Sequence, residues 1–203
     1  MIPVADYFSA HDNDSYMVAS SEKRHINDVP DEVFCSSCGW KSDWGFTRPS
    51  FKLKSRSLDV SCTYDGACIV SSAAREVFAD FIDGVFHVLP REPNFFHLVP
   101  IDVVEFDSEK RGTRFGDVCE SCKLPEWVAG ATPVYLNRLP DPSKHLFRTD
   151  VLFGSYNERS PLKIVSTDLL HALERAKLKG VVLKPIHAEQ CAPCKNDSRV
   201  GDS

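Results

Sequence analysis

Two stretches of the chain repeat apolar residues every three to four positions, which is the spacing of one buried helix face. One stretch follows Ile69-Val70-Ser71 and the other follows Ile164-Val165-Ser166, so each comes after an apolar strand and a serine that can cap a helix. The apolar positions are Ala74, Val77, Phe78, Phe81 and Ile82 in the first stretch, and Leu169, Leu170, Leu173 and Ala176 in the second. Each predicts an amphipathic helix, the second with Ser166 or Thr167 as N-cap and Gly180 just past its end.

The two helical stretches belong to a longer pattern that occurs twice. Residues 69–90 and residues 164–185 each read as strand, serine cap, helix, glycine and strand. Two copies about 95 residues apart predict a duplicated element, although an apolar strand followed by a helix is common enough for chance to give the same pattern. We expect an α+β fold, a single mixed domain with two similar strand-helix-strand lobes.

Short β-prone segments fill much of the remaining chain. The sequence TYDGA, with Asp65-Gly66 at its centre, predicts a tight hairpin turn. Further strands are predicted at Phe95–Pro100, Val103–Phe106, Pro133–Leu136 and His145–Phe147. No clear linker divides this part of the chain. Residues 33–187 are therefore expected to form the domain, after an acidic segment at 1–32 and before a polar tail at 188–203.

Composition and charge narrow the possible functions. With 203 residues, 42% of them hydrophobic, the chain is long enough to form an ordinary domain with its own core. Its net charge of −5 arises from residues 1–32, which hold seven acidic side chains and two basic ones. Such a balance argues against a general binder of nucleic-acid backbones, whereas a basic partner would favour the acidic segment.

The chain shows no sequence sign of export or of membrane insertion. No stretch approaches the roughly 20 apolar residues that a membrane span needs. The first residues lack the basic and apolar regions of a secretory signal. A cytoplasmic protein without membrane contacts is expected.

The eight cysteines fall into four pairs, three of which have Cys-x-x-Cys spacing. Two thiolates on one such turn can reach a single tetrahedral Zn²⁺, and two turns complete a four-sulfur site. Gly39 suits the first turn because glycine tolerates a positive φ, and Lys123 at the matching place of the second turn brings a cation to a negative centre. Although 80 residues separate the turns, one structural zinc ion is predicted on Cys35, Cys38, Cys119 and Cys122.

Other states of these cysteines stay open. They could be thiols without a metal, or disulfides if the protein is exported. A redox pair needs its turn at a strand-to-helix junction, and no helical pattern follows either turn. Cys62 and Cys68 flank the hairpin turn and are expected to be core or cross-strand thiols. Cys191 and Cys194 lie in the polar tail, where they either bind a second metal weakly, with His187 as a further ligand, or stay loose.

A search for catalytic motifs finds little. The sequence has no nucleophile elbow, no phosphate-binding glycine loop and no zinc-protease motif. His87 and His97 lie in apolar strand-like runs, where core or surface histidines are the usual finding. Solvated strand edges explain the carboxylates Asp102, Glu105 and Asp107 as well as an acid pair does. We expect that the protein is not an enzyme.

Three groups of residues carry a resemblance to a known family. They are Cys35-Ser-Ser-Cys38-Gly39-Trp40, the segment Gly112-Thr113-Arg114-Phe115-Gly116 just before Cys119-Glu-Ser-Cys122, and Leu146-Phe147-Arg148-Thr149 leading to the second helix and Gly180-Val181. In order and spacing they resemble the double-CXXCG motif family, which occurs as sets of paralogues in myxobacteria and their relatives and is associated with immunity to polymorphic toxins. The likeness covers residues 33–187, and its end, from Ile164 to Pro185, is similar to the immunity proteins numbered 43 in toxin-system catalogues. Lys123 departs from the family, whose second motif has glycine there.

The resemblance implies a zinc-stabilised protein that binds and neutralises a cognate toxin without catalysing a reaction. Many toxin domains that attack nucleic acids are basic, so an acidic inhibitor gains association rate by electrostatic steering. Expected contacts are then residues 6–32, the carboxylates at 102, 105 and 107, and exposed aromatics such as Trp40 or Trp44. The rival functions are a thiol redox enzyme and a zinc-stabilised structural or nucleic-acid-associated module using the basic run at 52–56.

Overall fold

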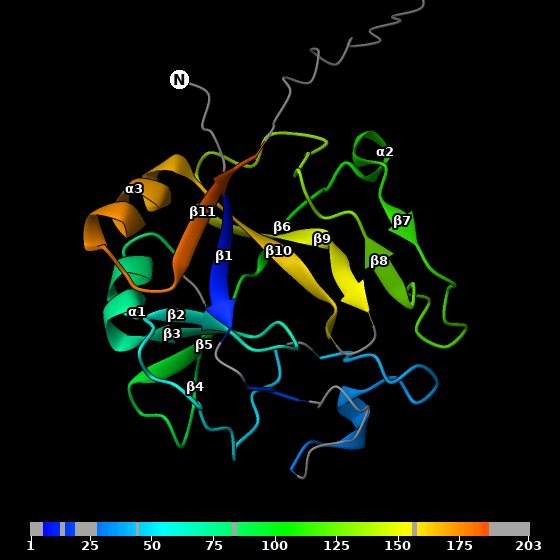
Figure 1. Ribbon diagram of the computed structural model, residues 1–203, viewed down its shortest axis with the longest axis horizontal. Helices are drawn as coiled ribbons and strands as arrows, with labels where there is room; N and C mark the ends of the chain where they lie inside the picture. Colours follow the sequence, from blue (N-terminus) through cyan, green and yellow to red (C-terminus); the bar gives the residue numbers. More distant parts are fainter. Residues whose placement is uncertain are drawn as a thin grey trace, which may run out of the picture.

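The computed structural model describes residues 6–12, 15–18, 28–43, 45–82, 85–155 and 158–186, and it has the mixed α+β composition that the sequence predicts (Figure 1). Its elements follow in this order: β1 (Asp6–Asp12), η1 (Asp31–Val33), β2 (Val60–Cys62), β3 (Cys68–Ser71), α1 (Ser72–Ala79), β4 (Val85–Val88), β5 (Phe95–Val99), β6 (Asp102–Val104), α2 (Ser108–Arg111), β7 (Arg114–Phe115), β8 (Trp127–Ala129), β9 (Leu146–Ser155), β10 (Ser160–Val165), α3 (Thr167–Ala176) and β11 (Val181–Pro185).

Strand β1 joins the two halves of the β-structure. One half has the order β4-β5-β3-β2, and the other contains β10-β9-β8-β7 with β6 paired to β9. The first residues of β1 pair with both β10 and β11, and its last residues, His11 and Asp12, pair in parallel with β2. The acidic segment 1–32 thus supplies a central strand, seen in dark blue between β11 and β10 in Figure 1.

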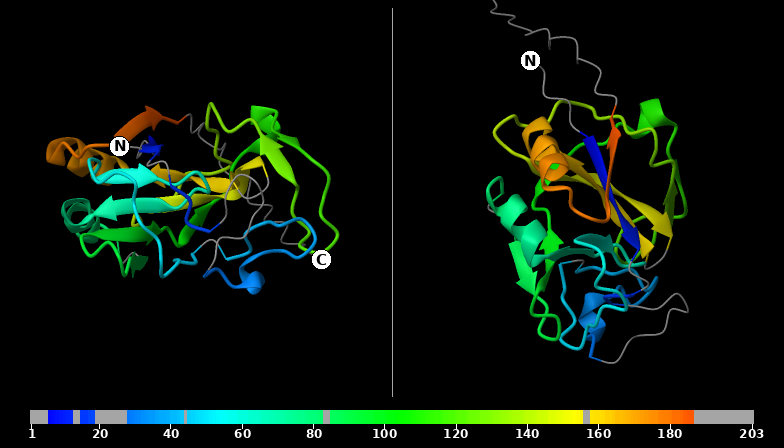
Figure 2. Two further views of the ribbon diagram at one scale, coloured as in Figure 1. Left: turned by 60° about the horizontal axis from the view of Figure 1, so that its bottom comes forward. Right: turned by 60° about the vertical axis from the view of Figure 1, so that its left-hand side comes forward.

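A strand-helix-strand unit with an inserted strand occurs in each half. Strands β3 and β4, which flank α1, are both antiparallel to β5 between them. Strands β10 and β11, which flank α3, are both antiparallel to β1 between them. Helices α1 and α3 contact each other on the same side of the molecule (Figure 2). Both predicted helices are therefore present in matching surroundings, and their origin by duplication stays a prediction.

Serine caps start the two helices as the sequence predicts. Ser71 Oγ accepts a hydrogen bond from the backbone N–H of Ala74 at 3.2 Å, and Ser166 Oγ accepts one from Leu169 at 3.3 Å. The predicted end of α3 was wrong, since the helix ends at Ala176 and Lys177 is its left-handed C-cap. Gly180 instead lies directly before β11, where a Cβ atom would collide with the carbonyl oxygen of Val60. Glycine is needed there for close approach to β2.

Two strand predictions need correction. The segment 133–136 forms no strand and contributes only an isolated bridge between Leu136 and Phe106. The strand predicted at 145–147 is the start of the ten-residue β9. Beyond Phe147, the sequence of β9 does not alternate cleanly between apolar and polar residues, because the polar Thr149 is fully buried. Its hydroxyl donates a hydrogen bond to the carbonyl of Val151 and accepts one from the N–H of Leu162.

In the described part of the chain, no helix combines the length and the apolar character of a bilayer span.

The predicted hairpin of β2 and β3 has a buried tip. Asp65 is fully buried, and its carboxylate accepts the backbone N–H groups of Met17 and Val18 at 2.9 and 2.7 Å. The ammonium group of Lys41, which is also buried, donates a hydrogen bond of 2.8 Å to the backbone carbonyl oxygen of Asp65. These contacts tie segments 15–18 and 28–43 to the turn, and they satisfy charges that would be costly to bury alone.

His97 lies inside this polar region, as expected for a core histidine. Its side chain is 1% exposed, and its Nδ1 hydrogen-bonds to Thr47 Oγ1 at 3.1 Å. Burial, together with the charge of Lys41, lowers the pKa of His97 from 6.5 to about 3. The imidazole is therefore neutral in the folded protein at every pH near neutrality.

The buried imidazole predicts a loss of stability on mild acidification. Because the pKa of His97 is lower in the folded state, the unfolded chain takes up a proton first, and stability falls as the pH drops below 6.5. Between pH 6.5 and 5 this contribution is about 2 kcal/mol. Denaturant titrations give the free energy of unfolding of wild type and of His97→Gln at both pH values. The change in wild type minus the change in the variant measures the contribution of His97, because protonation of the cysteines affects both proteins and cancels. Equal pH dependence of the two proteins would refute it.

Candidate metal centre

The two Cys-x-x-Cys turns share one backbone geometry. In the first, the N–H of Gly39 donates to the carbonyl of Cys35 at 2.8 Å, and in the second, Lys123 donates to Cys119 at 2.9 Å. The residue after each second cysteine has a positive φ, 69° at Gly39 and 59° at Lys123. Lys123 thus adopts the conformation that glycine prefers, at a cost of about 1–2 kcal/mol. The departure from glycine in the second motif leaves the turn intact.

The four cysteines singled out by the sequence lie together. The Sγ atoms of Cys35 and Cys119 are 3.9 Å apart, and those of Cys38 and Cys122 are 3.7 Å apart. All four sulfurs lie within 4.8 Å of one another. A tetrahedral ion with bonds of about 2.3 Å holds its sulfurs about 3.8 Å apart, whereas a disulfide needs about 2.05 Å. The spacing fits a metal ion, and the four cysteines are not joined by disulfides in this structure.

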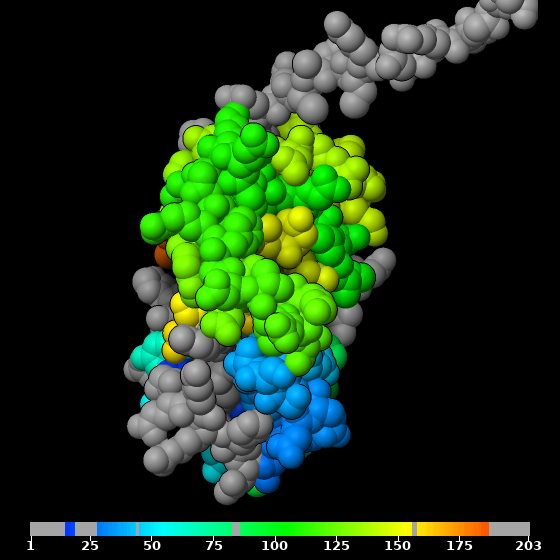
Figure 3. All heavy atoms as spheres, turned by 90° about the vertical axis from the view of Figure 1, so that its right-hand side faces the viewer, coloured from blue at the N-terminus to red at the C-terminus, as the bar shows by residue number. Residues whose placement is uncertain are grey.

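The cluster has approximate two-fold symmetry. Each contact joins residues 84 positions apart, and the hydroxyls of Ser37 and Ser121, on the matching positions of the two turns, hydrogen-bond to each other. Figure 3 shows the blue first segment lying against the green second one at the surface. Four sulfurs would fill the coordination sphere of a tetrahedral ion, so no position stays open for water or substrate.

The first and second cysteines of each turn differ in acidity. Backbone N–H groups of Cys38 and Ser37 lower the pKa of Cys35 to about 6, and those of Cys122 and Ser121 lower the pKa of Cys119. Burial raises the pKa of Cys38 to about 12 and raises that of Cys122. The turn backbones thus favour the thiolates of Cys35 and Cys119, whereas a metal has to displace protons from the other two sulfurs.

Arg159 provides a buried cation beside the cluster. It is 2% exposed, and its guanidinium lies 4.2 Å from the ring centre of Trp40. Burial lowers the pKa of Arg159, and the negative sulfurs of Cys38 and Cys122 oppose that effect. The sequence suggested Lys123 as the charge-balancing group, but Lys123 is exposed. Arg159 was missed because it follows the second turn by 37 residues and belongs to no motif.

Trp40 is the clear correction among the proposed contacts. It is 3% exposed, because it packs under Arg159, so it cannot serve as an exposed anchor for a partner. Trp44, His187, Cys191 and Cys194 lie outside the described residues.

The remaining carboxylate candidates are spread over separate contacts. Asp102 pairs with Lys144 at 3.8 Å, Glu105 pairs with Arg138 at 2.9 Å, and Asp107 caps α2. They form no shared acid pair.

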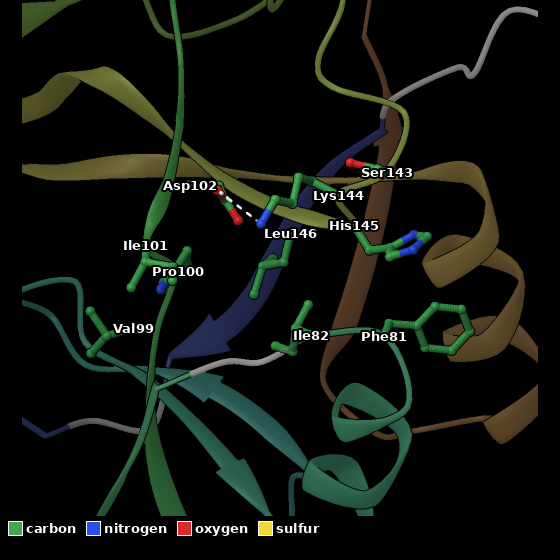
Figure 4. Close-up of a pocket in the computed structure, with 10 residues that line it drawn as sticks. All are labelled: Phe81, Ile82, Val99, Pro100, Ile101, Asp102, Ser143, Lys144, His145 and Leu146. Atoms are coloured by element: carbon green, nitrogen blue, oxygen red, sulfur yellow. Dashed lines mark ion pairs between the residues drawn. The ribbon is translucent and has the colours of Figure 1, made fainter.

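The cavity that includes Asp102 has a volume of 240 Å³ and lies between α1, the β5–β6 connection and the start of β9 (Figure 4). Its walls combine apolar side chains, Phe81, Ile82 and Ile101 among them, with polar ones, and the ion pair of Asp102 and Lys144 neutralises its main charges. His145 at its edge hydrogen-bonds through Nδ1 to the capping Ser166 at 2.8 Å.

Comparison of the chain with protein-family models and with curated proteins finds no match.

Replacing Arg159 should weaken metal binding. Removal of a cation next to four sulfurs lowers metal affinity by about 10- to 100-fold, as loss of a group supporting metal ligands typically does. Titration of the metal-free protein with Co²⁺, followed by its thiolate absorption bands, measures the effect in Arg159→Met. Arg159→Lys should keep part of the affinity, and the exposed Arg175→Met serves as the control. Unchanged Co²⁺ affinity in Arg159→Met would contradict a role for the charge.

Proposed function

We propose that the protein is a zinc-stabilised immunity protein that binds and neutralises a cognate bacterial toxin and catalyses no reaction. The observation that carries the proposal is the closed cluster of four cysteines, whose sulfurs all lie within 4.8 Å of one another. Four thiolates favour Zn²⁺ and leave it no catalytic position, so the ion serves the fold. A chain stabilised in this way can present a fixed surface to another protein.

A mixed acidic and apolar surface surrounds the cluster. We define the knuckle face as residues 28–43 and 114–127, which the four cysteines hold together. This face has seven carboxylates and three cations, of which Lys41 is buried. Between the charges lie large exposed apolar side chains, namely Phe115, Val118 and Trp127. Exposed aromatics inside a polar rim are the usual anatomy of a protein interface.

The charge of the knuckle face points to a basic partner. An acidic surface attracts a basic toxin domain over a distance and speeds its association. Nucleic acid is a poor alternative, since the basic run at 52–56 is partly neutralised by the 2.6 Å ion pair of Arg56 with Glu92. The partner that we infer is a basic toxin acting in the cytoplasm, where the immunity protein protects the cell that makes it.

Zinc should be present at close to one ion per chain. Cys35→Ser and Cys119→Ser should both lose it, because each removes one ligand of the same ion. Elemental analysis measures the content, and melting in the presence of a chelator should show a lower melting temperature. Cys68→Ser is the matched control, as Cys68 lies outside the cluster. Retention of zinc in either ligand variant would contradict a shared site.

Charge reversal on the knuckle face should slow toxin binding. Asp117→Lys with Glu120→Lys should lower the association rate with the product of an adjacent toxin gene by about tenfold at low salt, and less at high salt. Stopped-flow mixing measures the rate. Glu76→Lys with Glu174→Lys makes the same charge change on α1 and α3, which lie on the opposite side in Figure 1, and should leave the rate nearly unchanged.

Co-expression with that toxin tests the proposal as a whole. Wild type should restore growth and form a complex of nanomolar affinity. If it gives neither protection nor a complex, the immunity function is wrong.

A further inference from the structure

A second pair of cysteines lies directly across a hairpin. Cys62 at the end of β2 and Cys68 at the start of β3 are register partners, as the sequence predicts. The adjacent pair, Thr63 and Ala67, is joined by a backbone hydrogen bond of 2.9 Å. Because hydrogen-bonded and non-hydrogen-bonded pairs alternate along antiparallel strands, Cys62 and Cys68 form a non-hydrogen-bonded pair. In such pairs the Cα atoms are about 4.5 Å apart, a separation that a disulfide can bridge.

Lys163 makes the two thiols unequal. Its ammonium nitrogen lies 3.8 Å from the Sγ atom of Cys62, and the residue is only 7% exposed. A cation beside a thiol favours the thiolate, which is the reactive form. Cys62 is partly exposed, whereas Cys68 is 1% exposed. Cys62 therefore has both the charge and the access of an attacking thiolate, and Cys68 lies behind it as the second thiol.

The same surroundings disfavour a metal ion on this pair. Two sulfurs provide half of a tetrahedral site, and neither belongs to the four-cysteine cluster. What the arrangement favours is oxidation of the two sulfurs to each other.

We propose that Cys62 and Cys68 form a redox-active dithiol, separate from the metal centre, that a peroxide converts into a cross-strand disulfide. The Cys62 thiolate attacks one oxygen of hydrogen peroxide, the O–O bond breaks, and a sulfenic acid forms while the other oxygen leaves as hydroxide and takes up a proton. The Cys68 sulfur then attacks the sulfenic sulfur, its proton passes to the leaving oxygen, and the S–O bond breaks as the S–S bond forms. Two electrons pass from the thiols to the peroxide, and two waters result.

The second step uses the proton that Cys68 retains. Its hydrogen bond with Cys62 raises the pKa of Cys68, and burial raises it further. Cys68 is thus a protonated thiol until the sulfenic acid forms next to it, and then it supplies the proton that the departing oxygen needs. Return to the dithiol requires two electrons from a reducing thiol, by exchange through a mixed disulfide.

Peroxide treatment of the zinc-loaded full-length protein tests the proposal. Near-equimolar hydrogen peroxide should remove two hydrogens per chain, seen by intact mass, and non-reducing peptide mapping should find Cys62 joined to Cys68. Zinc content should stay constant, because the metal protects the four sulfurs of the cluster, and the peptide map distinguishes the Cys62–Cys68 bond from any bond between Cys191 and Cys194. This readout needs no variant. Thiols at 62 and 68 that stay reduced while zinc is released would overturn the proposal.

Variants separate the two roles. Cys68→Ser should stop at the sulfenic acid of Cys62, which a sulfenic-specific reagent traps, and Cys62→Ser should show neither product. Lys163→Gln should slow oxidation by about tenfold, the effect of one pKa unit on the thiolate fraction, whereas Lys163→Arg should keep most of the rate. Lys52→Gln, an exposed lysine, is the control. Equal rates in Lys163→Gln and wild type would remove the lysine from the mechanism.

Discussion

The structure depends on the contact between two short turns 84 residues apart. Once a metal has displaced the protons, four thiolates lie within 4.8 Å of one another and need cations to compensate their charge, of which the buried Arg159 supplies one. An ion bound by all four sulfurs would supply the rest. The first turn belongs to the segment 28–43, which contains only η1 and the isolated bridge between Phe34 and Lys41. Without the cluster, little regular structure would fix that segment.

Buried polar contacts support the same segment from its other end. Lys41 follows Trp40 directly, and its ammonium reaches the carbonyl of Asp65 in the β2–β3 turn. Asp65 in turn accepts two backbone N–H groups from segment 15–18. The turn therefore contacts two other parts of the chain, segments 15–18 and 28–43. Buried polar contacts of this kind favour one arrangement of the segments when every group is paired, because a shift of one segment against another would leave a buried charge unsatisfied.

The sequence predicted those features whose signals are local. Helices α1 and α3, their serine caps, the β2–β3 hairpin and the facing positions of Cys62 and Cys68 all follow from spacing within about 15 residues. Cysteine spacing and the tetrahedral preference of zinc also predicted that the two distant turns would meet. Features set by tertiary contacts were missed. Arg159 belongs to no motif. The sequence of β9 lacks apolar–polar alternation because the polar Thr149 is buried. Strand β1 gains its central place from partners far along the chain.

The central place of β1 has a consequence for folding during synthesis on the ribosome. Asp6 pairs with Val165 and Pro185, so an early strand has to wait for partners made about 160 to 180 residues later. During synthesis β2 is the first partner of β1 to be made, and the half containing β10 and β11 closes only after residue 185 has been made. Since such long-range pairing is slow, the insertion of β1 between β10 and β11 is expected to be a late step of folding.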